Sequence, residues 1–450
     1  MASLEAPASK SRFAESLAVY LKPRVLIVLF LGFSSGLPLA LSGSTLLVWM
    51  RESGVDLGTI GLFALVGTPY TVKFLWAPVV DALDVPLLAR LLGRRRGWLV
   101  FAQLLLIAAI VFLAFCNPAA APGLVAFGAL LVATASATQD IVIDAFRIDT
   151  LDESEQAAGM AAYVAAYRIG MLASPVGALY VVTGFESGLG FDKQAAWTAG
   201  YLAMALLVVI GIVTTLLATN PEKTGGKIDD PEGGRLARVW QAAMGAFAEF
   251  LSRDSAIAIL LFVVLYKFCD AFAGTMTAPF VIDLGFTRTD YANIVKGAGL
   301  AATLVGGFAG GAVARALPLT TCLWLGAILQ ALSNLVFAWL ALIDTSTTTP
   351  NTWGLVAVII AENFTGAIGT VIFVAYISAL CKNPLHTATQ FALLTALAAV
   401  GRTYLSSGAG FVAQDTGWPL FFILSALVAI PSLLLLAWLQ GRGHFKTLGA

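Results

Sequence analysis

The chain has 450 residues and no net formal charge, and 59% of its residues are hydrophobic while only 12% are charged. Soluble domains carry about a quarter charged residues, so this composition, with a mean hydropathy of +0.88, excludes an ordinary soluble domain. Long apolar runs recur along the whole sequence, and the ten-residue alternating segments of a β-barrel do not occur. The sequence therefore predicts an all-α integral membrane protein.

A helix needs about 20 apolar residues to cross a bilayer. We predict twelve transmembrane helices, at 24–49, 58–81, 97–116, 121–148, 157–183, 197–218, 255–283, 290–315, 319–343, 352–381, 387–413 and 418–440. The first 22 residues contain no apolar run that ends in a small-residue cleavage site, so no cleavable signal is expected. Gly32, Gly36, Pro38 and Gly43 predict a kinked first helix that lines a cavity.

The charges between the predicted spans are distributed unequally. If both termini are cytoplasmic, the cytoplasmic loops and tails hold eighteen of the 26 Lys and Arg residues, and the outer loops hold only Arg51, Lys193 and Arg288. Lys and Arg accumulate on the cytoplasmic side of membrane proteins, so this bias supports an even number of spans.

The longest predicted loop divides the twelve spans into two sets of six. Residues 219–254 begin as a linker rich in Gly, Pro and charge, and RLARVWQAAMGAFAEFLSR then predicts an amphipathic helix on the membrane surface. The resulting segments are a cytoplasmic N-terminus (1–23), two pseudo-symmetric six-helix bundles (24–218 and 255–440), the linker (219–254) and a cytoplasmic tail (441–450). Arg168 and Arg402 occupy matching places in the two halves, and repeated halves are typical of transporters with a substrate site near the midplane.

Nine charged residues lie inside the predicted spans and away from the span ends. Each costs about 2.5–3.5 kcal/mol on insertion scales, so they should face a cavity or a partner. They are Lys73, Asp140, Asp144, Arg168, Lys267, Asp270, Lys296, Glu362 and Arg402. The third, sixth, ninth and twelfth spans carry none, so we expect those four at the lipid-facing periphery and the others around a polar interior.

Depth counting at about 1.5 Å per residue predicts two clusters. Lys73, Asp140 and Arg168 lie at one level of the first half, and Lys267, Asp270, Glu362 and Arg402 lie near the midplane of the second. The five deep cations outnumber the three deep anions, which favours an anionic solute, although counting Asp144 reduces the surplus to one. The Lys267–Asp270 pair can equally neutralise itself.

Two of these carboxylates suit proton coupling. Burial and a nearby cation act in opposite directions on the proton affinity of a carboxyl group, so a substrate that competes for the cation can switch that affinity. Asp140 beside Arg168 and Glu362 beside Arg402 are the candidates. The alternative for Asp140 is a permanently paired structural carboxylate.

A further set of charges lies at the cytoplasmic rim. WAPVVDALDVPLLARLLGRRRGW contains Asp81, Arg94, Arg95 and Arg96 between the second and third spans. We expect a charge latch between this loop and the end of the fourth span, at Asp144, Arg147 and Asp149. Two alternatives stay open: plain cytoplasmic topology for the arginines, and a structural network that ties helix ends together.

KFLWAPVVD followed by GRRRGW resembles the signature between the second and third helices of the major facilitator superfamily, and the chain resembles its AmpG-type muropeptide permeases more narrowly. The matching stretches are VLFLGFSSGLPLAL, DLGTIGLFALVGTPYTVKFLWAP, TQDIVIDAFRIDTL, AYRIGMLASP, LYKFCDAFAGT, VKGAGLAATLVGG, ENFTGAIGTVIFVAYISALC and ATQFALLTALAAVGRTYLSS. One departure is SPVGAL at 174–179, where the family places glycines after Ser.

The resemblance implies alternating access and proton-driven import of N-acetylglucosaminyl-1,6-anhydro-N-acetylmuramic acid compounds, with or without peptide. It also implies a role in peptidoglycan recycling that signals β-lactamase induction. It places substrate-binding residues at Lys73, Gln139, Arg168, Lys267, Lys296, Asn363, Gln390 and Arg402. It places proton-coupling residues at Asp140, Asp270 and Glu362.

Other functions stay open at this point. A transporter of another anionic solute, such as an acetyl-CoA-type substrate, shares parts of these motifs. A membrane-embedded enzyme is disfavoured because neither histidine, His386 or His444, is spaced with Asp or Ser in a cavity helix, and a non-transporting sensor needs no charges in both halves. We expect no enzymatic activity, cofactor or metal, and the four single cysteines read as buried packing residues. The expected partners are the bilayer, a small glycopeptide and protons but no nucleic acid, for a monomer in the bacterial inner membrane.

Overall fold

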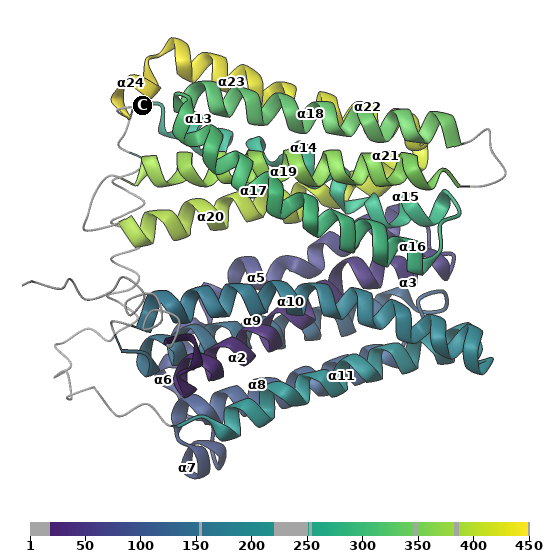
Figure 1. Ribbon diagram of the computed structural model, residues 1–450, viewed down its shortest axis with the longest axis vertical. Coiled ribbons are helices and arrows are strands. Elements are labelled where there is room, and N and C mark those ends of the chain that lie inside the picture. Colours follow the sequence, from purple (N-terminus) through teal and green to yellow (C-terminus); the bar gives the residue numbers. More distant parts are fainter. Residues whose placement is uncertain are drawn as a thin grey trace, which may run out of the picture. The chain divides into compact units, whose positions relative to one another are not determined.

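The computed structural model describes residues 19–152, 155–219, 251, 254–344, 350–381 and 387–448. Within these ranges every regular element is helical and no strand occurs (Figure 1), which confirms the all-α prediction. The amphipathic helix expected in the 219–254 linker falls almost wholly outside the described residues, as do residues 1–18, Lys382 and His386.

Eleven of the described helical stretches are long and apolar enough to cross a membrane, and they coincide with eleven of the predicted spans. The remaining predicted span, 387–413, is covered by the consecutive helices α20 (Thr387–Tyr404), η8 (Leu405–Gly408) and α21 (Ala409–Thr416). Gln390 and Arg402 lie in this stretch and lower its hydropathy. A helix is favoured in every span because hydrocarbon offers no partner for a backbone N–H or C=O group.

The chain divides into two compact units. The described residues of unit 1 are 19–42, 73–116 and 127–219, without 153 and 154. Its helices are η1 (Val19–Leu21), α2 (Pro23–Ala40), η4 (Lys73–Leu75), α6 (Ala77–Ala82), α7 (Leu88–Leu92), α8 (Arg94–Ala114), α9 (Pro122–Thr150, of which 122–126 group with unit 2), α10 (Gln156–Thr183), η6 (Gly184–Gly188) and α11 (Lys193–Leu217). Here α2 packs along α10 and α8 packs along α11.

Unit 2 takes in residues 43–72 and 117–126 together with the described residues from 251 onward. Besides η2 (Leu41–Thr45), which straddles the boundary, and α20, η8 and α21, its helices are α3 (Leu46–Glu52), α4 (Leu57–Leu62), η3 (Phe63–Gly67), α5 (Thr68–Val72), α13 (Ala256–Tyr266), α14 (Phe268–Thr275), α15 (Thr277–Asp283), α16 (Arg288–Asp290), η7 (Tyr291–Ala298), α17 (Gly299–Ala316), α18 (Leu319–Asp344), α19 (Thr352–Leu380), α22 (Trp418–Leu427), α23 (Ile430–Gly441) and α24 (His444–Thr447). Here α17 and α18 pack along α19, and α18 also packs along α22.

The division by contacts differs from the division at the 219–254 linker. Residues 43–72 belong to the first predicted bundle by sequence, but they group with unit 2 because α3 contacts α15 and α4 contacts α21. The first membrane helix passes from one unit to the other at η2, where Gly43 has non-helical dihedral angles of φ −100° and ψ −112°. The expected kink in this helix is therefore at Gly43, and the two-bundle division stays a prediction.

Glycines set the close packing of α2 on α10 in unit 1. A Cβ atom added to Gly36 would lie 2.1 Å from the carbonyl oxygen of Tyr167, and one added to Gly32 would lie 2.5 Å from that of Tyr163. Gly170 of α10 faces α2 in the same way, and a Cβ atom added to it would lie 2.3 Å from the carbonyl oxygen of Phe33. Small residues let two membrane helices approach backbone to backbone, so the seam between α2 and α10 depends on these three positions.

Helix α4 meets α21 in unit 2 through a second glycine contact. A Cβ atom on Gly410 would lie 1.8 Å from the carbonyl oxygen of Leu57, and one on Gly61 would lie 2.7 Å from the backbone nitrogen of Gly410. The backbone N–H of Gly58 also donates to Oε1 of Gln414 at 3.0 Å.

Ion pairs fasten the neighbouring helix α3 in unit 2. Arg51 pairs with Asp283 of α15, and its Nη2 donates to Asp283 Oδ2 at 2.8 Å. Arg288 Nε donates to both carboxylate oxygens of Glu52, at 2.6 and 2.7 Å. Asp283 also accepts from Arg51 Nε, and Trp418 Nε1 donates to its Oδ2 at 3.1 Å.

Side-chain caps mark the helix starts next to the loops. Asp56 accepts a hydrogen bond from the backbone of Thr59 at 2.8 Å, which lowers the pKa of the Asp56 carboxyl below its usual value. Asp192 and Asn351 cap α11 and α19 in the same way. These caps satisfy backbone N–H groups that the first turn of a helix leaves unpaired.

The glycine contact between α4 and α21 gives a stability prediction. We expect Gly410→Ala to lower the free energy of unfolding by roughly 1–3 kcal/mol, because its methyl group would force the two backbones apart. Gly408→Ala is the matched control, since a Cβ atom there meets nothing within 4 Å. Thermal unfolding of both variants in detergent tests this, and equal melting temperatures would contradict it.

Candidate functional site: two groups of ionisable side chains within the helices

In unit 1, Asp140 of α9 is joined to α2 and α10 through hydroxyl groups. Its side chain is buried, and Ser35 of α2 donates a hydrogen bond to its Oδ1. The Ser35 hydroxyl also lies 3.0 Å from the hydroxyl of Tyr163 on α10. The seam of glycines brings Ser35 this close to α10, so three helices meet at one carboxylate.

The surroundings of Asp140 agree only in part with the predicted cluster of Lys73, Asp140 and Arg168. Lys73 interacts electrostatically with both Asp140 and Asp144, and Arg147 interacts with Asp144. Arg168 is exposed on α10, and within the described ranges no ion pair or hydrogen bond joins it to Asp140. Gln139 is fully buried, and its amide atoms have no hydrogen-bond partner among the residues described.

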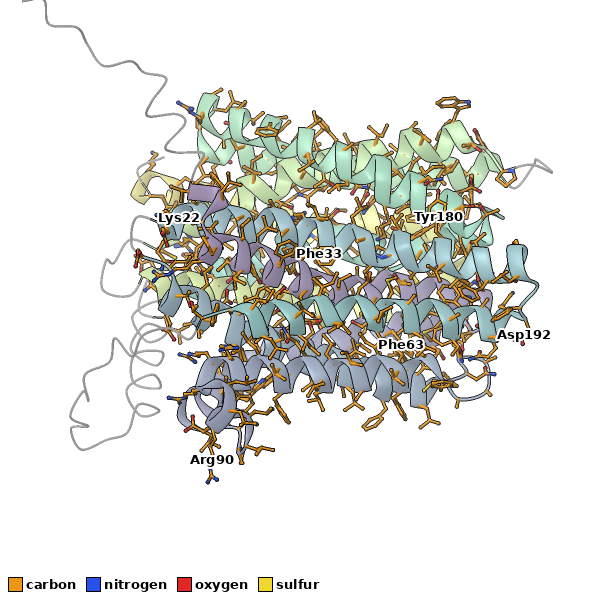
Figure 2. All side chains as sticks on the ribbon, turned by 60° about the horizontal axis from the view of Figure 1, so that its bottom comes forward. Lys22, Phe33, Phe63, Arg90, Tyr180 and Asp192 are labelled. Carbon is orange, nitrogen blue, oxygen red and sulfur yellow. The ribbon has the colours of Figure 1, made fainter. Side chains whose placement is uncertain are left out.

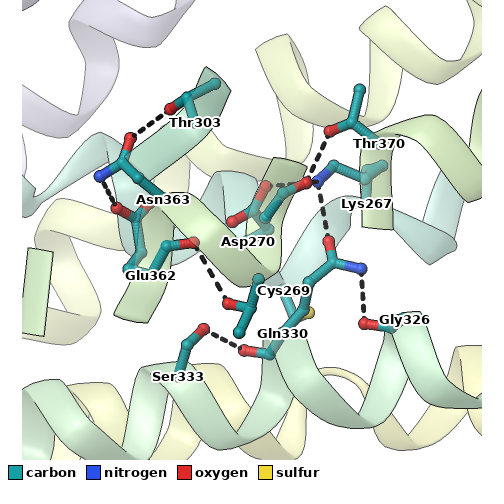
Figure 3. A network of polar contacts seen from close by, with 12 residues as sticks. Lys267, Cys269, Asp270, Thr303, Gly326, Gln330, Ser333, Glu362, Asn363 and Thr370 are labelled. Atoms are coloured by element: carbon teal, nitrogen blue, oxygen red, sulfur yellow. Dashed lines mark hydrogen bonds and ion pairs between the residues drawn. The ribbon is translucent and has the colours of Figure 1, made fainter. Parts of the chain in front are cut away.

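In unit 2, Lys267 is the centre of a polar network (Figure 3). Its Nζ lies 2.7 Å from Asp270 Oδ2 and donates to Gln330 Oε1 at 2.8 Å and to the carbonyl oxygen of Gly366 at 3.3 Å. Gln330 in turn donates to the carbonyl oxygen of Gly326 at 2.9 Å. Asp270 is therefore paired with Lys267, one turn before it. This agrees with the alternative that the two charges neutralise each other.

Glu362 lies beside this network on α19. It accepts a hydrogen bond from Asn363, whose side chain also receives one from Thr303 at 3.2 Å (Figure 3). Glu362 interacts electrostatically with Asp270, Lys267 and Lys296. A carboxylate placed between one acid and two lysines can take up a proton or keep its charge according to what occupies the lysines.

The other predicted binding residues of unit 2 lie at different places. Lys296 belongs to η7, and its Nζ lies 5.4 Å from the ring centroid of Tyr291. Arg402 is exposed on α20, and among the described contacts of Glu362 there is none with Arg402. Gln390 is buried at the start of the same helix.

Ion pairs also join the helix ends of unit 1 that we expect on the cytoplasmic side. Arg95 Nε donates to Asp149 Oδ2 at 2.8 Å, and Arg94 lies 3.4 Å from Asp84. Arg96 donates to the carbonyl oxygens of Thr215 and Leu216, at 3.0 and 2.7 Å, and so caps the end of α11. The side chain of Asp81 lies outside the described residues.

A second tie at this end of unit 1 joins the chain before α2 to the chain before α10. Lys22 Nζ donates to Glu155 Oε1 at 2.7 Å, and this hydrogen bond lowers the pKa of the Glu155 carboxyl. Lys22 and Arg90 lie at one end of the unit 1 helices and Asp192 lies at the other (Figure 2).

The sequence analysis missed three polar residues that the structure places in these groups. Ser35, Tyr163 and Gln330 are neutral, and counting charges alone could not find them. We expected the ninth span, α18, to face lipid only. This expectation is wrong, because Gln330 of α18 is buried and accepts a hydrogen bond from Lys267. Gln103 of α8 likewise accepts a hydrogen bond from Thr215 of α11 at 3.2 Å, so two expected peripheral helices share a buried polar contact. These residues could have been found in the sequence as amide or hydroxyl side chains inside otherwise apolar runs.

Comparison with known proteins gives concordant results. The family profile of the Major Facilitator Superfamily matches residues 28–402. The anhydromuropeptide permease of Escherichia coli K12 is 40% identical over 424 residues, which cover 94% of this chain and 81% of that protein. A Rickettsia felis protein described as transporter AmpG 4 is 33% identical and covers 93% of this chain and 97% of its own length.

Solved structures show the same fold. A POT family transporter in complex with 5-aminolevulinic acid has a TM-score of 0.68 at 14% identity, over 92% of this chain and 95% of that one. A bacterial homologue of the human lysosomal transporter Spinster has a TM-score of 0.63, also at 14% identity, over 94% and 96% of the two chains. With its helices and its two groups of charges within the spans, this chain belongs to the major facilitator superfamily and, within it, to the AmpG-type anhydromuropeptide permeases.

Proposed function

We propose that this membrane transporter imports anhydromuropeptides into the bacterial cytoplasm together with protons. The observation that carries the proposal is the 40% identity to the Escherichia coli anhydromuropeptide permease over 94% of the chain. Similarity of this extent includes both the Asp140 group and the Lys267 group. The cargo is GlcNAc-1,6-anhydro-MurNAc, with or without peptide, and its lactyl or peptide carboxylate is the anion that the deep cations attract.

The carboxylates Asp140 and Glu362 are the proposed proton carriers, with Asp270 as a further candidate. Support comes from their surroundings, since each has a neutral hydrogen-bond donor and a lysine nearby. Neutral donors stay in place when the carboxylate takes up a proton, whereas the lysine favours its ionised form. Such a site can change charge without rearranging the helices.

The proposed substrate ligands are Lys73, Gln139, Arg168, Lys267, Lys296, Asn363, Gln390 and Arg402. Exposure distinguishes Arg168 and Arg402 among them, because both residues are exposed within predicted spans. Arginine binds carboxylates in bidentate geometry, so these two residues suit the anchoring of the substrate's carboxylates.

The proposed setting is the bacterial inner membrane, with both termini in the cytoplasm, in line with the bias of Lys and Arg. Imported anhydromuropeptides would feed peptidoglycan recycling and, through it, β-lactamase induction. The transporter would alternate between two conformations, and the latch at the rim of unit 1 would favour one of them.

The direct test is uptake of labelled GlcNAc-1,6-anhydro-MurNAc into vesicles that contain the purified protein, with and without an imposed proton gradient. We expect accumulation only with the gradient. Equal uptake under both conditions would remove the proton from the mechanism, and no uptake above that of empty vesicles would remove the substrate.

Neutralising the proton carriers should separate transport from folding. We expect Asp140→Asn and Glu362→Gln each to abolish gradient-driven accumulation, because an amide cannot release and rebind a proton. An amide keeps the acceptor for Ser35 or Asn363, so size-exclusion profiles in detergent should match the wild type. Undiminished gradient-driven uptake by both variants would exclude these carboxylates from coupling.

Removing the proposed anchors should weaken substrate binding. We expect Arg168→Ala and Arg402→Ala each to raise the Kd for the labelled disaccharide by about 10- to 100-fold, the equivalent of one charge-assisted hydrogen bond. Arg315→Ala is the control, because Arg315 is an exposed arginine at the end of α17. Wild-type affinity in both test variants would refute the assignment.

If the Arg95–Asp149 ion pair acts as a latch, breaking it should impair transport without loss of stability. Partly exposed ion pairs contribute about 0–1 kcal/mol, so Arg95→Asp should change the free energy of unfolding little. We expect this variant to transport slowly and the charge-swapped Arg95→Asp/Asp149→Arg variant to regain speed, as measured by initial uptake rates. Wild-type rates in the single variant would leave only the structural alternative for this pair.

A further inference from the structure

Three oxygen-bearing side chains from three helices form a continuous hydrogen-bonded chain in unit 1. Asp140 of α9 accepts from Ser35 of α2, and Ser35 lies 3.0 Å from the hydroxyl of Tyr163 on α10. Asp140 and Ser35 are buried, and Tyr163 is partly exposed. The hydrogen-bonded chain therefore leads from a buried carboxylate to an aromatic residue that is partly exposed.

The ionised state of Asp140 fixes the direction of this chain. A carboxylate can only accept hydrogen bonds, so the single hydroxyl hydrogen of Ser35 points to Asp140. Ser35 then has no hydrogen left for Tyr163, and the contact between the two hydroxyls must be donated by Tyr163. In this state the hydrogen of Tyr163 is directed inward and unavailable to a ligand.

Protonation of Asp140 allows the opposite direction. The new O–H of Asp140 can donate to Ser35, and the Ser35 hydrogen then rotates to the oxygen of Tyr163. The Tyr163 hydrogen is released to point at another acceptor. Only hydroxyl groups rotate, each oxygen keeps its own hydrogen, and the one bond formed is that between Asp140 and the incoming proton.

We propose that Ser35, as a positioning residue, and Tyr163, as a substrate-binding residue, couple the protonation of Asp140 to the binding of the substrate's carboxylate. This inference rests on the proposed function and adds two residues to it. When Asp140 carries a proton, Tyr163 offers its O–H group to the carboxylate, and when Asp140 is ionised that donor is withdrawn. Because coupling between two sites is reciprocal, a bound carboxylate also favours the protonated state of Asp140.

The packing of α2 on α10 supports this role. Gly32 lies against the backbone of Tyr163 itself, and Gly36 and Gly170 continue the same seam. Tyr163 is also stacked on Tyr167, with ring centroids 6.1 Å apart and an interplanar angle of 27°. The seam and the ring stack hold Tyr163 in register with Ser35 while its hydroxyl hydrogen remains free to rotate.

Other ionisable groups act on the same residues and must be kept unchanged in a test. Lys73 and Asp144 interact electrostatically with Asp140, and Asp144 and Tyr167 interact with Tyr163. Substitutions at Ser35 and Tyr163 remove one hydroxyl each and leave these neighbours in place.

The test measures the Kd for labelled GlcNAc-1,6-anhydro-MurNAc at acidic and at alkaline pH, together with transport in vesicles. For the wild type we expect tighter binding at acidic pH, by a factor within the range of about 5- to 150-fold that is usual for coupled sites. In Tyr163→Phe and in Ser35→Ala this factor should fall toward one. Gradient-driven accumulation should be lost in both variants, while exchange of labelled for unlabelled substrate without a gradient should persist.

Two control variants remove comparable hydroxyls that lie outside the chain. Ser34→Ala alters the residue next to Ser35, which is equally buried and whose hydroxyl has no partner among the described residues. Tyr201→Phe alters a buried tyrosine whose hydroxyl donates to the carbonyl oxygen of Leu41 at 3.2 Å. Both controls should retain the wild-type ratio of affinities and gradient-driven accumulation.

A double variant that combines Tyr163→Phe with Asp140→Asn separates an effect on coupling from an effect on folding. If Ser35 and Tyr163 act through Asp140, adding Tyr163→Phe to Asp140→Asn should cause no further loss of coupling. A wild-type affinity ratio in Tyr163→Phe, a parallel loss of accumulation and exchange, or additive defects in the double variant would each overturn the inference. If the wild type binds no disaccharide or accumulates none under a gradient, it is the proposed function that fails, and the inference falls with it.

Discussion

An ionised side chain loses its water when a helix crosses a bilayer, and this desolvation decides where the chain can place its charges. The cost is several kcal/mol for each group unless a partner or a wet cavity replaces the water. Lys267 meets this requirement with one carboxylate, one amide oxygen and one backbone carbonyl. Asp140 meets it with a hydroxyl and a nearby lysine. The proposed proton coupling requires that a carboxylate satisfied in this way is stable in one charge state and still able to reach the other.

The sequence predicted the fold class and eleven of the spans because the length and hydropathy of each apolar run are local properties. It also predicted the kink of the first helix from its glycines and proline, and the structure places that kink at Gly43. The grouping of residues 43–72 with unit 2 could not be predicted, because it depends on contacts of α3 and α4 with α15 and α21, more than 200 residues away in sequence. Apolar runs carry no information about which helices become neighbours.

The sequence identified the charged residues of the two groups, but it predicted only some of the residues that contact them. The sequence correctly singled out the Lys267–Asp270 pair, since a spacing of three residues places both side chains on one helical face. Depth counting placed Lys73 and Arg168 with Asp140, and the structure gives Asp140 the predicted lysine but a serine in place of the arginine. Depth alone does not fix the rotation of a helix, and rotation decides whether a side chain faces its neighbour. Ser35 and Gln330 were overlooked for a related reason, because neutral hydrogen-bonding residues leave no trace in a count of charges.

The two ion pairs that fasten α3 in unit 2 come from adjacent residues of opposite sign, Arg51 and Glu52, and they meet Asp283 and Arg288. A slip of α3 by one residue in one direction would bring Glu52 toward Asp283, and a slip in the other direction would bring Arg51 toward Arg288, so either slip would replace an attraction with a repulsion. The arrangement therefore specifies the register and rotation of this helix as well as its proximity. The two ion pairs thus favour one docked position of α3 over the positions one residue away on either side.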